Sequence, residues 1–131
     1  MPGARDERLV YLLIAALAVY WLVLGIFMIA APHTFYKQAG PFGPYNRHYT
    51  RDNATFAVAF GIALIVSLRI PSWRVPVLAV TVIQGALHTV NHIVDISHAH
   101  PKKYGPGDAI GVGLLTLFTL WVTLRANRLR T

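Results

Sequence analysis

The chain has 131 residues, of which 55% are hydrophobic and only 13% are charged, whereas about 25% of the residues in soluble domains are charged. This length is enough for one domain, and the absence of cysteine excludes disulfides, thiolate metal sites and thiol catalysis. The net charge is +7, but the lysines and arginines form no basic stripe of the kind that nucleic-acid binding needs, so no nucleic-acid partner is expected.

Four apolar runs predict four transmembrane helices, at about residues 9–31, 53–69, 75–96 and 108–125. The first and third have the length of a membrane span, about 20 residues. The second and fourth runs are shorter. They can still cross the bilayer if the side chains of Arg69 and Arg125 extend to the membrane–water interface and the bilayer adapts. A soluble bundle needs a charged face on each helix, and the first run has none. We therefore expect an all-α polytopic membrane protein, with one domain over residues 1–131 that forms an antiparallel bundle of four transmembrane helices.

The first apolar run is expected to stay in the protein as a membrane helix. It is much longer than the apolar region of a signal peptide, about 7–15 residues, and no convincing cleavage site follows it. The distribution of Lys and Arg then predicts which side of the membrane the two termini face. Seven of them share the side of the two termini (Arg5, Arg8, Arg69, Arg74, Arg125, Arg128 and Arg130), against five on the other (Lys37, Arg47, Arg51, Lys102 and Lys103). The prediction is a multi-pass protein of the cell membrane with both termini in the cytoplasm.

The connection after the first span begins at Pro32, which cannot continue a helix. The segment that follows is rich in Phe and Tyr, as is typical of residues at the headgroup level of a bilayer. An ordered cap over the mouth of the bundle is the alternative. At the start of the second span, His48 and Asp52 are four residues apart, and Arg51 and Asn53 stand beside them as candidates for a polar pocket.

The third span carries a polar stripe that an ordinary membrane helix lacks. At 100° per residue, its five members fall within an arc of roughly 120°: Gln84, His88, Asn91, His92 and Asp95. Ionisable groups at membrane depth are costly and usually face a bundle interior or a cavity, where they are candidates for function. The stripe therefore predicts a polar pocket in the outer half of the bundle.

A transition metal ion (Zn, Fe, Cu or Mn) is one candidate ligand, because imidazole and carboxylate groups bind such ions. His88 and His92 are spaced i and i+4, and Asp95 follows His92 by three, so all three face one side of the helix. His48 and Asp52 lie at a similar depth and could complete the site. No known metal signature matches this spacing.

Other interpretations compete with the metal site. The stripe can hold helices together, since Asn, Gln and His form hydrogen bonds between membrane helices, and each Asp can pair with an arginine. A proton relay or a pocket for a small polar ligand is the third option. In the fourth span, Asp108 is expected to cap the helix N-terminus, and Gly111 and Gly113, like Gly25 and Gly61, are expected to let helices pack closely.

The layout resembles small four-helix membrane proteins of the DoxX-like type. The likeness consists of the long connection after Pro32, the run from Tyr45 to Asp52 that enters the second helix, and the tight connection between the second and third helices. The histidine-rich stretch QGALHTVNHIVDISHAH is not part of that pattern. The resemblance implies four spans, often in complexes with other membrane proteins, and it transfers no catalytic residues.

The sequence thus favours a small integral membrane protein whose pocket binds a metal ion or a small polar ligand, with an enzymatic role left open. One alternative is a structural or accessory subunit of a membrane complex, in which the stripe contacts another membrane protein or a second copy of the chain. Another is a proton-coupled transport component. In each case the lipid bilayer is the expected surrounding.

Overall fold

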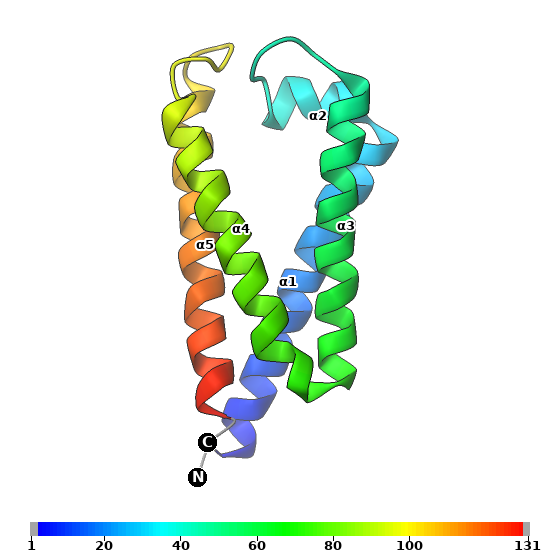
Figure 1. Ribbon diagram of the computed structural model, residues 1–131, viewed down its shortest axis with the longest axis vertical. Coiled ribbons are helices and arrows are strands. Elements are labelled where there is room, and N and C mark those ends of the chain that lie inside the picture. Colours follow the sequence, from blue (N-terminus) through cyan, green and yellow to red (C-terminus); the bar gives the residue numbers. More distant parts are fainter. Residues whose placement is uncertain (1–2, 130–131) are drawn as a thin grey trace.

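A computed structural model describes residues 3–129, and helices are the only regular elements in this range (Figure 1). Four of the helices are long and apolar enough to cross a membrane, which confirms the all-α class and agrees with a multi-pass membrane protein. Arg130, which the orientation argument counted, lies outside the described residues. The elements are α1 (Ala4–Ala30), α2 (Pro32–Ala39), α3 (Arg47–Arg69), the 3₁₀ helix η1 (Pro71–Trp73), α4 (Arg74–Val94) and α5 (Tyr104–Arg128).

The helix boundaries follow from local chemistry. Because Pro32 lacks an N–H group, α1 ends before it, and Pro32 becomes the first residue of α2. The side chain of Asn46 accepts hydrogen bonds from the backbone N–H groups of His48 and Tyr49, which caps α3. Helix α5 begins with Lys103 as its N-cap. The prediction that Asp108 caps this helix is wrong, because Asp108 lies in its second turn.

The long helices pack in two pairs, α1 along α3 and α4 along α5. Glycines bring the helices of each pair together. A Cβ atom added to Gly61 would lie 2.6 Å from Leu22 of α1, and one added to Gly85 would lie 2.5 Å from the Thr116 hydroxyl of α5. A Cβ on Gly25 would likewise meet Val58 at 2.7 Å. The close-packing prediction is therefore confirmed for Gly25 and Gly61.

Gly111 and Gly113, the two glycines of α5 that the sequence singled out, are packed less closely than Gly25 and Gly61. Gly113 lies near Thr89 of α4 at ordinary contact distance. Gly111 has no atom within 4 Å of an added Cβ, so the packing role expected for it is wrong.

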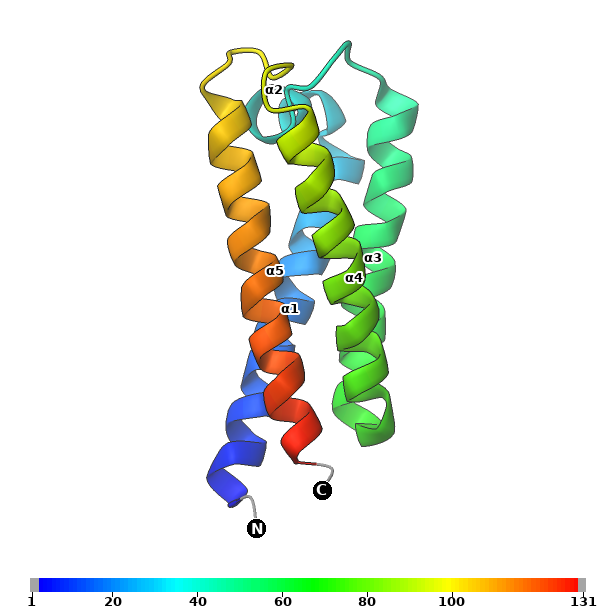
Figure 2. The ribbon, with the colours of Figure 1, turned by 60° about the vertical axis from the view of Figure 1, so that its left-hand side comes forward.

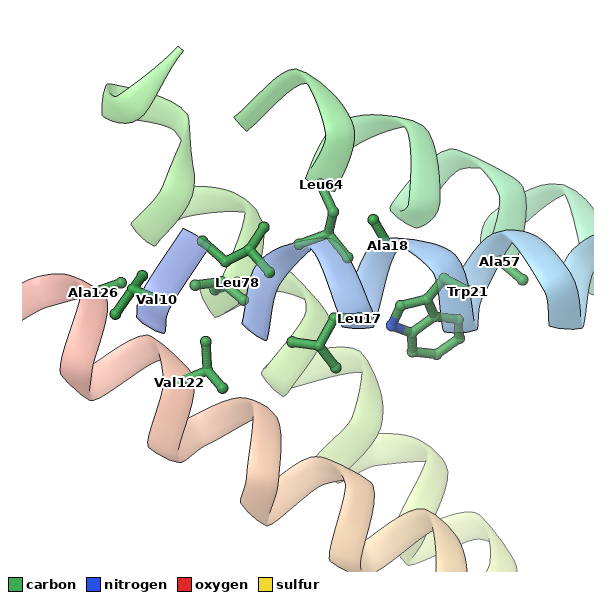
Figure 3. Close-up of a cluster of buried hydrophobic side chains, with 10 residues drawn as sticks. Val10, Leu17, Ala18, Trp21, Ala57, Leu64, Leu78, Val122 and Ala126 are labelled. Atoms are coloured by element: carbon green, nitrogen blue, oxygen red, sulfur yellow. The ribbon is translucent and has the colours of Figure 1, made fainter. Parts of the chain in front are cut away.

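The two pairs meet at one end of the molecule. Residues 3 and 129 both lie there, so we call it the terminal end; the opposite end, with α2 and the connection between α4 and α5, is the loop end (Figures 1 and 2). The buried apolar core joins all four long helices near the terminal end (Figure 3). Its members are Val10, Ile14, Leu17, Ala18, Trp21, Ala57, Leu64, Leu78, Val122 and Ala126.

Toward the loop end, α3 and α4 diverge (Figures 1 and 2). Phe60 and Ala63 of α3 are partly buried beside α4, whereas Phe56, one turn closer to the loop end on the same face, is 65% exposed. The two loop-end connections nevertheless touch. Phe42 and Ala99 form an isolated β-bridge, and the backbone N–H of His100 donates to the Pro41 carbonyl at 2.9 Å.

Candidate functional site

The polar stripe of α4 lies on the side of the helix that turns toward α3. Gln84 follows Val77 by seven residues and Val80 by four, so the three share a face, and Val77 and Val80 line a groove with Phe60 of α3. Near the terminal end this face is apolar and closes against α3. In the half near the loop end the same face is polar, and α3 has moved away from it (Figure 1).

Burial varies along the stripe. Gln84, His92 and Asp95 are half-buried, whereas His88 and Asn91 are exposed. Val90, on the other side of α4, is 58% exposed and represents the surface that lipid would cover. The stripe is thus neither sealed inside the protein nor turned toward that outer surface. It lies along the side of α4 from which α3 diverges (Figure 1), where the exposed Phe56 of α3 and His88 of α4 mark an opening between the two helix pairs.

Two imidazoles form the centre of the stripe. The Nε2 atoms of His88 and His92 lie 3.3 Å apart, close enough for a hydrogen bond in which one ring donates and the other accepts. The Phe42 ring from the loop-end connection meets the His92 ring edge-on, with 4.9 Å between ring centroids. Because the bridge to Ala99 holds Phe42 in place, the long connection caps this part of the site, as one of the two interpretations of that segment expected.

Four buried polar atoms have no hydrogen-bond partner among residues 3–129, and two of them belong to the stripe. These two are Gln84 Oε1 and His92 Nδ1. An unpaired buried acceptor or donor costs about 1–3 kcal/mol, and in the interior of a membrane no bulk water is present to satisfy it. A polar ligand that paired with these atoms would recover that free energy.

The other two unpaired atoms are Trp21 Nε1 of α1 and Asp108 Oδ2 of α5. The Trp21 side chain extends from α1 toward α4 and α5 (Figure 3), and only 8% of the residue is exposed. Asp108, Leu115 and Val122 are spaced by seven residues and share a face, and Val122 belongs to the core. Both polar groups therefore face the interior of the helix bundle.

The sequence did not single out Trp21 or Asp108 for this role. A tryptophan in an apolar helix is usually a packing residue, which describes the Trp21 ring but not its N–H group. Asp108 was assigned to a helix cap because it follows a Gly-Pro-Gly turn. A usable signal was present all the same, because a lone carboxylate seven residues before Leu115 in an apolar helix lies on the core face.

The residues proposed as metal ligands fall into separate pairs. His48 Nε2 lies 3.2 Å from Asp52 Oδ2, and both side chains are exposed at the start of α3. His98 Nδ1 lies 3.2 Å from Asp95 Oδ1. Each carboxylate is thus paired with a histidine and not with an arginine. Within residues 3–129, no group of three or more His, Asp or Glu side chains is placed to hold a metal ion. His88 and His92 could supply two ligands to a metal ion, and further ligands would have to come from residues other than the five proposed or from another molecule.

The two remaining pocket candidates lie on different faces of α3. Asn53 precedes Phe60 by seven residues and therefore shares the face turned toward α4, although it is exposed. Arg51 precedes Phe60 by nine residues, which places it roughly 180° away around the helix. Asn53 can thus contribute to the wall opposite the stripe, whereas Arg51 points away from the opening.

No known family model, curated protein or solved structure matches this chain. The resemblance to DoxX-like proteins stays a prediction. The chemistry of the site must therefore be judged from its own residues. It offers one indole donor, amide and carboxylate acceptors, and imidazoles able to do either, an arrangement suited to hydrogen bonding.

Proposed function

We propose that this protein is an integral membrane protein, an antiparallel bundle of four transmembrane helices, that binds a small hydrogen-bonding ligand between its helix pairs. The observation that carries this proposal is the set of four unpaired polar atoms on three helices: Trp21 Nε1, Gln84 Oε1, His92 Nδ1 and Asp108 Oδ2. Buried polar groups in native proteins are nearly always paired. Because these exceptions lie on three helices, and two of them on the stripe, we infer that bound polar groups complete their hydrogen bonds.

A role as an accessory subunit is the second candidate, and the divergence of α3 and α4 favours it. Phe56 on α3 and His88 on α4 are both exposed on the facing sides of the opening. A helix from another membrane protein, or from a second copy of this chain, would cover them. Under this alternative, the polar atoms of the stripe pair with the partner helix.

Native mass spectrometry of the protein released from its own membranes tests the ligand proposal. The expected result is a small molecule bound to the intact chain as an added mass. The double variant Gln84→Leu with His92→Leu should lose it, because it removes two of the four polar groups at nearly constant volume. Val90→Ala, on the side of α4 away from the stripe, is the matched control and should retain the molecule.

The other outcomes separate the alternatives. A stoichiometric transition metal that disappears in His88→Ala would support the metal version of the site. A second polypeptide that leaves with the double variant would support the subunit role. Parent protein that carries no added mass beyond detergent and bulk phospholipid would contradict the proposal of a bound ligand.

A further inference from the structure

The imidazoles of His88 and His92 have the separation of two ligands on one metal ion. Their Nε2 atoms lie 3.3 Å apart, whereas their ring centroids lie 4.6 Å apart, so the two nitrogen atoms stand on the facing edges of the rings. In a tetrahedral zinc site, two imidazole nitrogens that each bind at about 2.0–2.1 Å lie about 3.3–3.4 Å from each other. The distance between the Nε2 atoms therefore matches one edge of such a site.

Helix α4 and the loop-end connection hold this pair in place. Because His88 and His92 are four residues apart, their side chains lie one above the other on a single face of the helix. The Phe42 ring meets the His92 ring edge-on, with 4.9 Å between centroids, and the bridge to Ala99 fixes Phe42. His88, by contrast, is exposed. Protein thus supports the pair at His92, and the opening leaves it accessible at His88.

The end of α4 also favours a cation at this position. His92 lies in the last turn of the helix, and the C-terminus of a helix carries a partial negative charge. Asp95 follows as the C-cap, and its carboxylate adds a negative charge about one turn from His92. A divalent ion that loses part of its hydration in a membrane protein needs such compensation. The electrostatics therefore agree with the geometry of the two nitrogen atoms.

The pair is only half of a tetrahedral site. Among the described residues, no group of three or more His, Asp or Glu side chains could hold a metal ion. Zinc sites with open positions bind water or a small molecule there. From this geometry we propose that His88 and His92 bind Zn²⁺ through their Nε2 atoms. Water or a small polar molecule from the opening fills the two remaining positions.

This zinc site goes beyond the proposed function, because it uses other atoms. The unpaired atoms of the stripe are Gln84 Oε1 and His92 Nδ1, whereas zinc binds the two Nε2 atoms. Without zinc, one Nε2 atom carries the proton of the hydrogen bond between the rings. When zinc binds, that proton moves to Nδ1 of the same ring, so no net proton is released. Zinc thereby fixes His92 Nδ1 as a hydrogen-bond donor.

Cobalt(II) binding to cysteine variants tests the site on the full chain, in detergent and a reducing buffer. Co²⁺ that is bound by a thiolate absorbs strongly in the near ultraviolet through a charge-transfer band. Because the chain has no cysteine, such a band can come only from an introduced thiolate. We expect a saturable band in His88→Cys and in His92→Cys, each of which keeps one histidine, and its loss when Zn²⁺ displaces Co²⁺. Val90→Cys, on the side of α4 away from the stripe, is the matched control and should show no band.

Titration with zinc against a chromogenic chelator measures the affinity of the parent protein. We expect one Zn²⁺ per chain. In His88→Ala and in His92→Ala, binding should be at least about tenfold weaker, because even the loss of a partner that only orients a ligand costs about 10–100-fold in metal affinity. His48→Ala, which removes the exposed pair with Asp52, should bind zinc as tightly as the parent protein. Thermal unfolding checks that each variant folds.

Three results would overturn the inference. A band as strong in Val90→Cys as in His88→Cys would show that cobalt binds any exposed thiolate. Equal zinc affinity of His88→Ala and the parent protein would leave the pair as a hydrogen bond alone. One Zn²⁺ per two chains would show that a second copy, and not water, completes the site. Gln84→Leu keeps both zinc ligands and should retain zinc, so failure of the zinc site and failure of the proposed function can be told apart.

Discussion

The terminal half and the loop half of this molecule differ in packing and in polarity. At the terminal end, apolar side chains from all four long helices pack into one core, and Ile14, Leu64 and Val122 are fully buried there. At the loop end, α3 and α4 separate, and the facing surfaces carry imidazole, amide and carboxylate groups. The same helices thus hold the fold together over one half and leave polar groups such as His92 and Asp108 unpaired over the other.

This difference shows where stability and function are placed. In lipid, the hydrophobic effect does not drive helices together, so close packing must do so. The terminal half supplies that packing through apolar side chains and Gly61. The loop half is consequently free to carry groups that weaken the fold. Unpaired buried polar atoms of this kind are expected at functional sites.

The largest effect should come from filling a glycine contact. Gly61→Leu introduces a side chain whose first atom already meets Leu22 at 2.6 Å, and overpacking of this kind costs typically 1–3 kcal/mol or more. We expect a large loss of folded protein, measured by size-exclusion chromatography and thermal unfolding in detergent. Gly111→Leu in the loop half has open space and is the control. If both variants behaved alike, the two halves would not differ in packing.

Truncation of large side chains should also separate the halves. Leu64→Ala in the core leaves a cavity and should lower the free energy of unfolding by on the order of 2 kcal/mol. Phe56→Ala removes a larger side chain from the loop half, but that residue is 65% exposed, so the change should stay within about 0.5 kcal/mol. Unfolding by a denaturing detergent measures both. A Phe56→Ala effect as large as that of Leu64→Ala would mean that the opening is closed in the folded protein.

A smaller effect of opposite sign is expected at the stripe. Gln84→Leu replaces an unpaired buried acceptor with an apolar side chain of similar size. The ligand-free protein should become more stable by about 1 kcal/mol, which would appear as a raised midpoint of thermal unfolding. Destabilisation by a similar amount would show that the amide has a partner and that the stripe holds helices together.

The smallest effect is expected for the exposed pair on α3. His48 and Asp52 lie 3.2 Å apart, but their side chains are 82% and 55% exposed, and ion pairs at such sites contribute about 0–1 kcal/mol. His48→Ala should leave ligand binding and thermal unfolding nearly unchanged. A clear loss of ligand binding in His48→Ala would instead show that His48 belongs to the polar site, as the sequence predicted.

The sequence was a good guide to the helices and a partial guide to the site. Long uncharged runs and Pro32 were enough to predict the four long helices, because length and hydropathy dominate at membrane depth. Helical periodicity also placed Gln84, His88 and His92 on one face. Each of these inferences needs only the sequence of a single helix.

Relations between helices could not be predicted in the same way. Within residues 3–129, His48 and Asp52 do not form a metal-binding group with the stripe. Helix α3 diverges from α4 toward the loop end (Figure 1), and nothing in either helix alone determines that divergence. The sequence also could not predict that the Trp21 N–H lacks a partner, because this depends on the neighbouring helices. A tryptophan in an apolar helix is usually a packing residue.

The central claim is that the polar face of α4 lines an opening that polar molecules can enter. Because the chain has no cysteine, single-cysteine variants with a charged, membrane-impermeant thiol reagent test it directly in intact membranes. Gln84→Cys and His88→Cys should react and be protected by bound ligand, whereas Val90→Cys on the opposite side of α4 and Leu78→Cys in the core should not react. If Gln84→Cys and His88→Cys were as unreactive as Val90→Cys, the stripe would face lipid or a partner helix and the account would be contradicted.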